Sequence, residues 1–172
     1  QEMDDYLNIK IEGVGSSMNL SSLSTTTGRN GHTLFSVLDG NTLSLPSLKN
    51  VANSRFSVSG QQSSIVADSS LASYSSTGLY SAGDGTWTLL VADLDGELDL
   101  PAIQTINAAV PTNGGFDRTV HNITAKAGGT INLSGVTTIT SPQESDDYLS
   151  FNLSGEESSI DVTSLATIRG TG

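Results

Sequence analysis

Cysteine is absent from this chain, and aromatic, proline and basic residues are scarce. Among 172 residues, 5% are aromatic, 4 are proline and only 7 are Lys or Arg, against 18 Asp and Glu. Without cysteine there is no disulfide framework and no Cys-based zinc or redox site. The net charge of −11 repels phosphate backbones, so we expect no nucleic-acid partner. No apolar run approaches the ~18 residues of a membrane span, so we also expect no membrane insertion.

Small hydroxyl residues and glycine dominate instead, with 27 Ser, 19 Thr and 18 Gly. This composition disfavours helix, and no segment keeps an apolar stripe at the helical period for three turns. Leu, Ile and Val nevertheless recur at regular intervals, which is enough to build a core. The sequence therefore predicts an all-β fold.

An apolar motif repeats along the chain with the pattern apolar-x-apolar-x-x-apolar-x-x-apolar. Its copies, of which the third is degraded, begin at Met18, Leu43, Ile65, Leu98, Ile131 and Ile160. A strand-like segment precedes each copy, and in four copies nine residues separate an apolar residue of that segment from the motif, as from Leu89 to Leu98. Residues 4–7 (DDYL) return as residues 146–149, 142 residues later, which gives a period of about 28 residues.

We interpret each repeat as one coil of a right-handed parallel β-helix (β-solenoid) of about six coils, because parallel crossovers are right-handed as a rule. Alternate side chains of a strand point inward, so equivalent apolar residues of successive coils should stack into three internal files. The first file is Met18, Leu43, Ile65, Leu98, Ile131 and Ile160, the second is Leu20, Leu45, Ala67, Leu100, Leu133 and Val162, and the third is Leu23, Leu48, Leu71, Ile103, Val136 and Leu165. We expect a single solenoid domain over residues 1–172, cut from a longer chain, in which a charge at Leu100 or Leu133 disrupts the stack.

The strings at 43–51 (LSLPSLKNV) and 98–106 (LDLPAIQTI) resemble two kinds of solenoid. One is the leucine-rich-like repeat of receptor L domains, and the other is the Ser/Thr/Gly-rich β-helical repeat of large bacterial secreted and surface proteins. The second resemblance covers nearly the whole chain and fits its acidic, hydroxyl-rich, cysteine-free composition. It implies a secreted or cell-surface protein in which this segment is structural or adhesive and not catalytic.

The two ends of the repeats show no amphipathic capping helix. Open solenoid ends expose unpaired strand edges. We therefore expect other copies of the chain, or neighbouring repeats, as partners through the ends or edges of the solenoid.

Acidic residues alternate at 93–99 (DLDGELD). A bend at Gly96 could bring Asp93, Asp95 and Glu97 together, and Ca²⁺ binds where several carboxylate oxygens converge. Calcium is the one cofactor that this pattern suggests. The alternative is a solvated acidic face that keeps the protein soluble.

Three aromatic residues, Tyr74, Tyr80 and Trp87, lie around the longest insertion. Exposed rings of this kind stack on sugars, so a carbohydrate-binding module with a polysaccharide partner is the alternative function. The competing interpretation places Trp87 at the start of a strand with its side chain pointing inward.

A polysaccharide lyase or hydrolase is a further alternative, since such enzymes also use parallel β-helices. His32 and His121 are not in metal-ligand spacing, and we expect His121 to point outward. Arg118 beside Asp117 is the only candidate for a catalytic base next to an acid. We interpret this pair as a surface ion pair. We therefore expect no enzyme.

Outward residues, all of them polar except Val66, form a column beside the first internal file. Asn132 stands between two Asp residues there, which permits hydrogen bonds along the column without like-charge contact. We interpret this column as structural and not as a sugar-binding groove. Its members are Asn19, Ser44, Val66, Asp99, Asn132 and Asp161.

Overall fold

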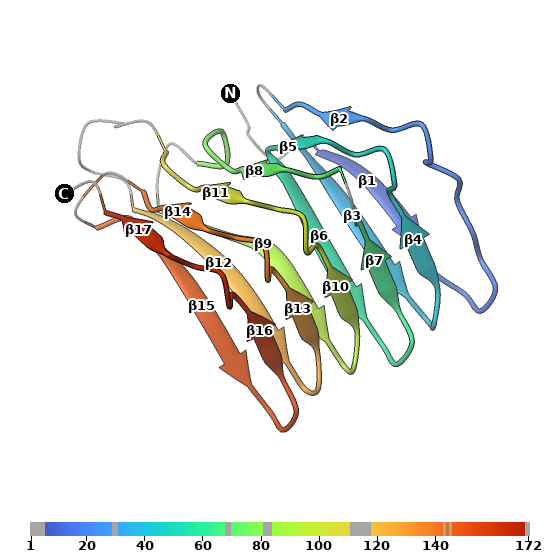
Figure 1. Cartoon of the computed structure of the whole chain (residues 1–172). Helices are drawn as coiled ribbons and strands as arrows, with labels where there is room; N and C mark the ends of the chain where they lie inside the picture. Colours follow the sequence, from blue (N-terminus) through green and yellow to red (C-terminus); the bar gives the residue numbers. More distant parts are fainter. Residues whose placement is uncertain are drawn as a thin grey trace.

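The computed structural model describes residues 6–28, 31–67, 70–80, 84–110, 118–142, 144 and 146–170. Within these residues all regular secondary structure is β-strand, arranged in three sheets whose strands all pair in parallel (Figure 1). The all-β prediction is confirmed. The described residues contain no helix long and apolar enough to cross a membrane.

The largest sheet, called the long sheet below, has its strands in the order β1-β3-β6-β9-β12-β15. They are β1 (Tyr6–Ile11), β3 (His32–Leu38), β6 (Ser54–Ser59), β9 (Gly85–Asp93), β12 (Thr119–Lys126) and β15 (Tyr148–Ser154).

Two sheets of two- and three-residue strands complete the structure. The first short sheet contains β4 (Thr42–Ser44), β7 (Ser64–Val66), β10 (Glu97–Asp99), β13 (Thr130–Asn132) and β16 (Ser159–Asp161). The second short sheet contains β2 (Thr25–Thr26), β5 (Asn50–Ala52), β8 (Ser73–Ser75), β11 (Thr105–Asn107), β14 (Thr138–Thr140) and β17 (Thr167–Arg169).

The chain visits the three sheets in turn before it returns to the long sheet. After β3 it passes through β4 and β5, and its next strand, β6, pairs with β3. The same order holds for the strands that follow, so the three sheets run side by side from β1 and β2 to β15, β16 and β17 (Figure 1). This topology is consistent with a parallel β-helix.

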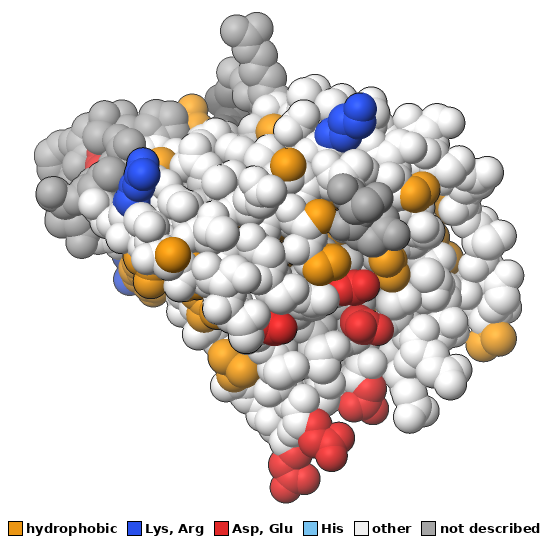
Figure 2. Space-filling model, in the orientation of Figure 1, with side chains coloured by type: hydrophobic (Ala, Val, Ile, Leu, Met, Phe, Trp, Pro, Cys, Tyr) orange, Lys and Arg blue, Asp and Glu red, His pale blue; other side chains and the backbone are white. Residues whose placement is uncertain are grey.

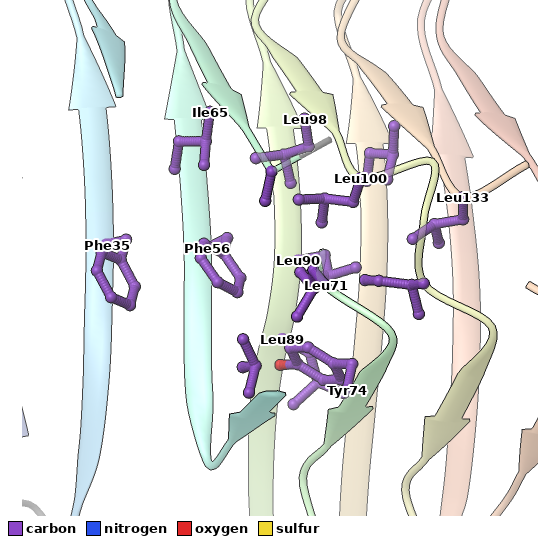
Figure 3. Close-up of a cluster of buried hydrophobic side chains, with 14 of the residues drawn as sticks. Phe35, Phe56, Ile65, Leu71, Tyr74, Leu89, Leu90, Leu98, Leu100 and Leu133 are labelled. Atoms are coloured by element: carbon purple, nitrogen blue, oxygen red, sulfur yellow. The ribbon is translucent and has the colours of Figure 1, made fainter. Parts of the chain in front are cut away.

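The internal files are where the repeat predicts them. Leu43, Ile65, Leu98 and Ile131 follow one another in register across the first short sheet, and each is almost fully buried. In the second file Leu45, Leu100 and Leu133 are 0% exposed. Figure 3 shows Ile65, Leu98, Leu100 and Leu133 of these files inside the sheets. At about 1.5–3 kcal/mol for each buried aliphatic side chain, the files are the main source of stability.

The predicted inward residue is wrong in β9. Ile123 pairs with Leu90 and Asn122 with Thr88, so Leu89 is an extra residue in the strand, a β-bulge. Phe56 of β6 likewise pairs with Leu90. Leu90, eight residues before Leu98, therefore occupies the place that the sequence interpretation gave to Leu89, although the bulge leaves both leucines fully buried.

Two turn lengths connect the long sheet to the first short sheet. Short turns have positive φ at two successive residues, the signature of a type I′ turn, and long turns have positive φ at two residues with one between them. The short turns carry it at Asp39 and Gly40, Leu94 and Asp95, and Ala127 and Gly128, and the long turns at Gly13 and Gly15, Gly60 and Gln62, and Gly155 and Glu157. The strands on both sides of these turns stay in register although the turns differ in length. The additional residue of a long turn is therefore accommodated within that turn.

Candidate functional site

Exposed hydrophobic side chains gather at the two ends of the sheets. Of nine large hydrophobic residues that are exposed among the described residues, eight lie in the first or the last passage through the sheets, and the ninth is Leu94. Scattered single apolar residues on a surface need no explanation, but apolar groups gathered at one place mark an interaction site. The eight are Tyr6, Leu7, Val14 and Met18 at one end and Tyr148, Phe151, Leu153 and Ile168 at the other.

The end formed by β15, β16 and β17, called the C-terminal face below, is hollow. A cavity of about 360 Å³ opens there, lined by Leu149, Phe151 and Leu153 of β15 and by Ile160 of β16, together with apolar residues of β14, β17 and the segment between β16 and β17. These side chains belong to the internal files, but β15, β16 and β17 each have a neighbour on one side only. Among the described residues, this cross-section of the core has no further strand over it.

The opposite end, called the N-terminal face below, is formed by β1, the segment 18–23 and β2. Leu7 is 61% exposed and Met18 is 42% exposed, whereas Leu43, Ile65 and Leu98, which occupy the place of Met18 in the next repeats, are buried. Residues 18–20 form no strand, which is why the first short sheet has one strand fewer than the other two. Leu20 and Leu23 pack against the core but are themselves only partly buried.

His121 points inward, contrary to our expectation. It is 0% exposed, with its Nε2 2.7 Å from the carbonyl oxygen of Leu79 and its Nδ1 3.2 Å from Oγ of Ser76. A carbonyl oxygen only accepts, so Nε2 carries the hydrogen and Nδ1 accepts from the Ser76 hydroxyl. Burial lowers the pKa of His121, and the Leu79 hydrogen bond and the negative charge of Asp147 oppose this shift only in part.

A pH dependence of stability follows from this histidine. Its folded-state pKa lies below the ordinary value near 6.5, so the folded chain binds fewer protons than the unfolded chain as the pH falls below that value. The free energy of unfolding should therefore be fully retained above pH 6.5 and decline as the pH falls toward the lowered pKa. Urea unfolding from pH 7.5 to 5 measures this decline.

The His121→Gln variant is the comparison for that experiment. It keeps a polar side chain without the titration, so its stability should change less between pH 6.5 and 5 than that of the native chain, whatever its stability at pH 7.5. Parallel curves for the two proteins would show that His121 does not titrate on unfolding in this range.

The three aromatic residues proposed for sugar binding do not form one exposed platform. Tyr74 is 1% exposed and lies in the core beside Phe56 (Figure 3), with its hydroxyl donating to the carbonyl oxygen of Ser54. Burial raises the pKa of Tyr74. Tyr80 is partly exposed, and Trp87 is partly buried against the core. Only Tyr80 and Trp87 therefore offer any ring surface to a ligand.

Trp87 also contacts the other histidine. The edge of its ring meets the ring of His32, with centroids 5.3 Å apart and planes at 82°. The Trp87 Nε1 atom is buried and has no hydrogen-bond partner. This placement agrees with the interpretation of Trp87 as an inward residue at the start of a strand.

The acidic residues proposed for calcium lie at one corner of the fold without converging on a common point. Asp93 is paired with Lys126, with Oδ2 3.0 Å from Nζ, while Asp95 lies in a type I′ turn and Glu97 is exposed at the start of β10. Acidic side chains gather along the edge where these turns lie (Figure 2). Within the described ranges, no three His, Cys, Asp or Glu residues are grouped so that they could hold a metal ion. Calcium binding by these three residues stays a prediction.

The pair considered for an enzyme is described only in part. Asp117 lies outside the described residues. The backbone N–H of Arg118 donates to Oδ1 of Asp84 at 3.0 Å, which ties the start of β12 to the start of β9. This contact is structural and involves only the backbone of Arg118.

Comparisons with protein-family models, with curated proteins and with solved structures find no match. The candidate site therefore has to be argued from its own geometry.

The outward polar column is in register as predicted. Asp99, Asn132 and Asp161 occupy equivalent places in β10, β13 and β16. The Asn132 amide donates from Nδ2 to Oδ1 of Asp99 at 2.7 Å, and its Oδ1 accepts from the backbone N–H of Ser134 at 3.0 Å. The local turn therefore holds the Asn132 amide so that it points toward the preceding strand.

Proposed function

We propose that this chain is a non-catalytic structural or adhesive segment of a secreted or cell-surface protein, built as a right-handed β-solenoid of six coils. Six strands in the long sheet and six in the second short sheet support the coil number. The preference of parallel crossovers for the right hand supports the handedness. The resemblance to bacterial surface repeats supports the location.

The filled interior is the observation that carries this proposal. The side chains that face inward from all three sheets are almost completely buried against one another, from Phe35 and Leu43 through to Val136 and Ile139. Ligand sites are usually concave and apolar with a few convergent polar groups. The most apolar hollow described here, at the C-terminal face, is instead an exposed end of the core.

A glycan array tests the proposal against its main alternative. We expect no saturable binding of the native chain to any glycan through these three residues, because Tyr74 is enclosed and Tyr80 and Trp87 are only partly exposed. Saturable binding that Trp87→Ala abolishes, while the circular dichroism spectrum stays native, would establish a carbohydrate-binding module instead.

The same polysaccharides provide a control for catalysis. Incubation with the chain should release no new reducing or unsaturated ends. Release of such ends in proportion to protein concentration would identify a hydrolase or a lyase and overturn the non-catalytic proposal.

A further inference from the structure

Residues 76–80 (STGLY), called the 76–80 segment below, lie between β8 and β9 and belong to none of the three sheets. The segment begins with a ladder-type contact, in which the Ser76 N–H donates to the carbonyl oxygen of Asn107 at 2.9 Å. The Leu79 N–H donates only within the segment, to the carbonyl oxygen of Ser76 at 2.9 Å. Beyond Ser76, therefore, no strand ladder fixes the segment.

One polar anchor of the 76–80 segment is Asn53, the residue between β5 and β6. Its Oδ1 accepts the backbone N–H of Gly78 at 2.8 Å, and its Nδ2 donates to the carbonyl oxygen of Gly28 at 2.6 Å. The Asn53 side chain is an amide that does not titrate. This anchor is therefore the same at every pH.

The other polar anchor is His121 of β12, which holds the segment at two points. Its Nε2–H donates to the carbonyl oxygen of Leu79, and its Nδ1 accepts from the Ser76 hydroxyl. The side chain of Leu79, 2% exposed, packs in the core next to this contact. Of the two polar anchors, only His121 can respond to pH.

The closed segment fits the neutral form of His121 and not the protonated form. A proton on Nδ1 makes this atom a donor, so the Ser76 hydroxyl would have to turn its own hydrogen away. Ser76 is 0% exposed, and its hydroxyl has no second hydrogen-bond partner in the described part of the chain. Protonation would therefore leave a buried hydrogen unpaired and a buried imidazolium out of reach of water.

The elements packed against His121 supply little to stabilise that charge. Its register neighbours are Trp87 of β9 and Leu149 of β15, which are both uncharged. The 76–80 segment has no Asp, Glu, Lys, Arg or His. A compensating charge can therefore come only from outside these elements.

The acids near His121 lie in the turn before β15. Asp147 acts on the ring through its negative charge, and its N–H donates to the carbonyl oxygen of Glu144 in the same turn. Oδ1 of Asp147 already accepts the backbone N–H of Thr119 at 2.5 Å. Burial outweighs the attraction of Asp147, which is why the pKa of His121 lies below its ordinary value.

We propose that the 76–80 segment is an acid-released latch, which neutral His121 holds closed and which opens when the ring takes up a proton. Opening lets water reach the imidazolium and takes Leu79 out of the core. Because no ladder beyond Ser76 has to break, the segment can open while the three sheets stay intact. This device goes beyond the proposed structural role and does not depend on it.

Amide hydrogen exchange followed by NMR in the native chain tests the latch. The amides of Gly78 and Leu79 should exchange faster than that of Leu100, which is bonded to Asn132 inside the sheets, and low urea should not accelerate them. Their protection, corrected for the intrinsic pH dependence of exchange, should fall at least about tenfold from pH 7.5 to 5, because the open state takes up a proton below about pH 6.5.

Four variants identify the group that responds. His121→Gln should remove the fall in protection, and Ser76→Ala, which keeps the ring but removes the partner of its Nδ1, should reduce it. Asn53→Gly removes the anchor that does not titrate, so it should speed exchange by a similar factor at both pH values and leave the fall intact. His32→Gln makes the same change at the other histidine and should behave as the native chain does.

Three results would overturn the proposal. The first is exchange of Gly78 and Leu79 with the same protection and urea dependence as Leu100, which would mean that the segment opens only when the whole chain unfolds. The second is protection that does not change between pH 7.5 and 5. The third is an undiminished fall in Ser76→Ala or in His121→Gln. None of them bears on the structural role, which the glycan and polysaccharide assays test separately.

Discussion

Replacement of Leu100 by Asp is expected to abolish the folded state. Leu100 is 0% exposed and lies in an internal file beside Leu133, so the new carboxylate would have neither water nor a cation near it. The cost is on the order of 4 kcal/mol or more, a large part of the ~5–15 kcal/mol that stabilises a typical domain. Loss of the β-sheet circular dichroism signal and of a cooperative urea transition would show the effect.

Leu94→Asp is the matched control, because it makes the same chemical change a few residues earlier in the chain. Leu94 is 55% exposed and lies in a turn at the edge of the sheets, so its replacement should change the free energy of unfolding by less than about 1 kcal/mol. A cooperative transition of Leu100→Asp close to that of Leu94→Asp would contradict the assignment of Leu100 to the core.

Phe56→Ala should cost about 3–5 kcal/mol, the range for removing a buried phenylalanine ring. The Phe56 ring stacks on Phe35 at a centroid distance of 5.1 Å and contacts the tilted ring of Tyr74 at 6.4 Å (Figure 3). All three rings are enclosed, and the neighbouring strands are held by ladders on both sides, so the space left by the ring cannot collapse fully. The midpoint of urea unfolding measures the loss.

Phe151→Ala provides the comparison within the same inward file of the long sheet. Phe151 is 36% exposed at the C-terminal face, so its removal leaves no enclosed cavity and should cost clearly less than Phe56→Ala. Both variants have to be compared at a concentration at which the chain is monomeric. Equal costs would mean that Phe151 is as enclosed as Phe56, and that the C-terminal face is covered in solution even then.

The internal files could be predicted from the sequence because two regularities agree on them. Alternation within a strand marks the inward residues, and recurrence of the motif aligns one strand with the next, as for Leu98 and Ile131. Where either regularity is ambiguous the prediction fails. Leu89, Leu90 and Val91 are consecutive apolar residues, so alternation alone cannot say which of them faces inward, and only the pairing with Phe56 and Ile123 decides it.

His121 was missed for a different reason. Its position in β12 is one of the inward places, but a histidine there is unfavourable unless its ring nitrogens are satisfied. The groups that satisfy them, Ser76 and the carbonyl of Leu79, lie in a segment 45 and 42 residues away in sequence. No local pattern in β12 indicates these partners.

The exposure of apolar residues in the first and last strands, by contrast, could be predicted from the sequence. The first and last strands of the described residues have a neighbour on one side only, so exposed aliphatic residues there follow directly. The aromatic platform was mistaken in its inclusion of Tyr74, whose place in β8 opposite Val51 and Ile106 puts it inside.

The two turn lengths at the edge of the long sheet have a consequence for protein engineering. A residue gained or lost there changes one bend and leaves the levels above and below untouched, as the pairing of Phe56 with Leu90 across a long and a short turn shows. This edge therefore tolerates the gain or loss of a single residue. A peptide grafted there would be displayed at a fixed spacing along the rod without disturbing its interior.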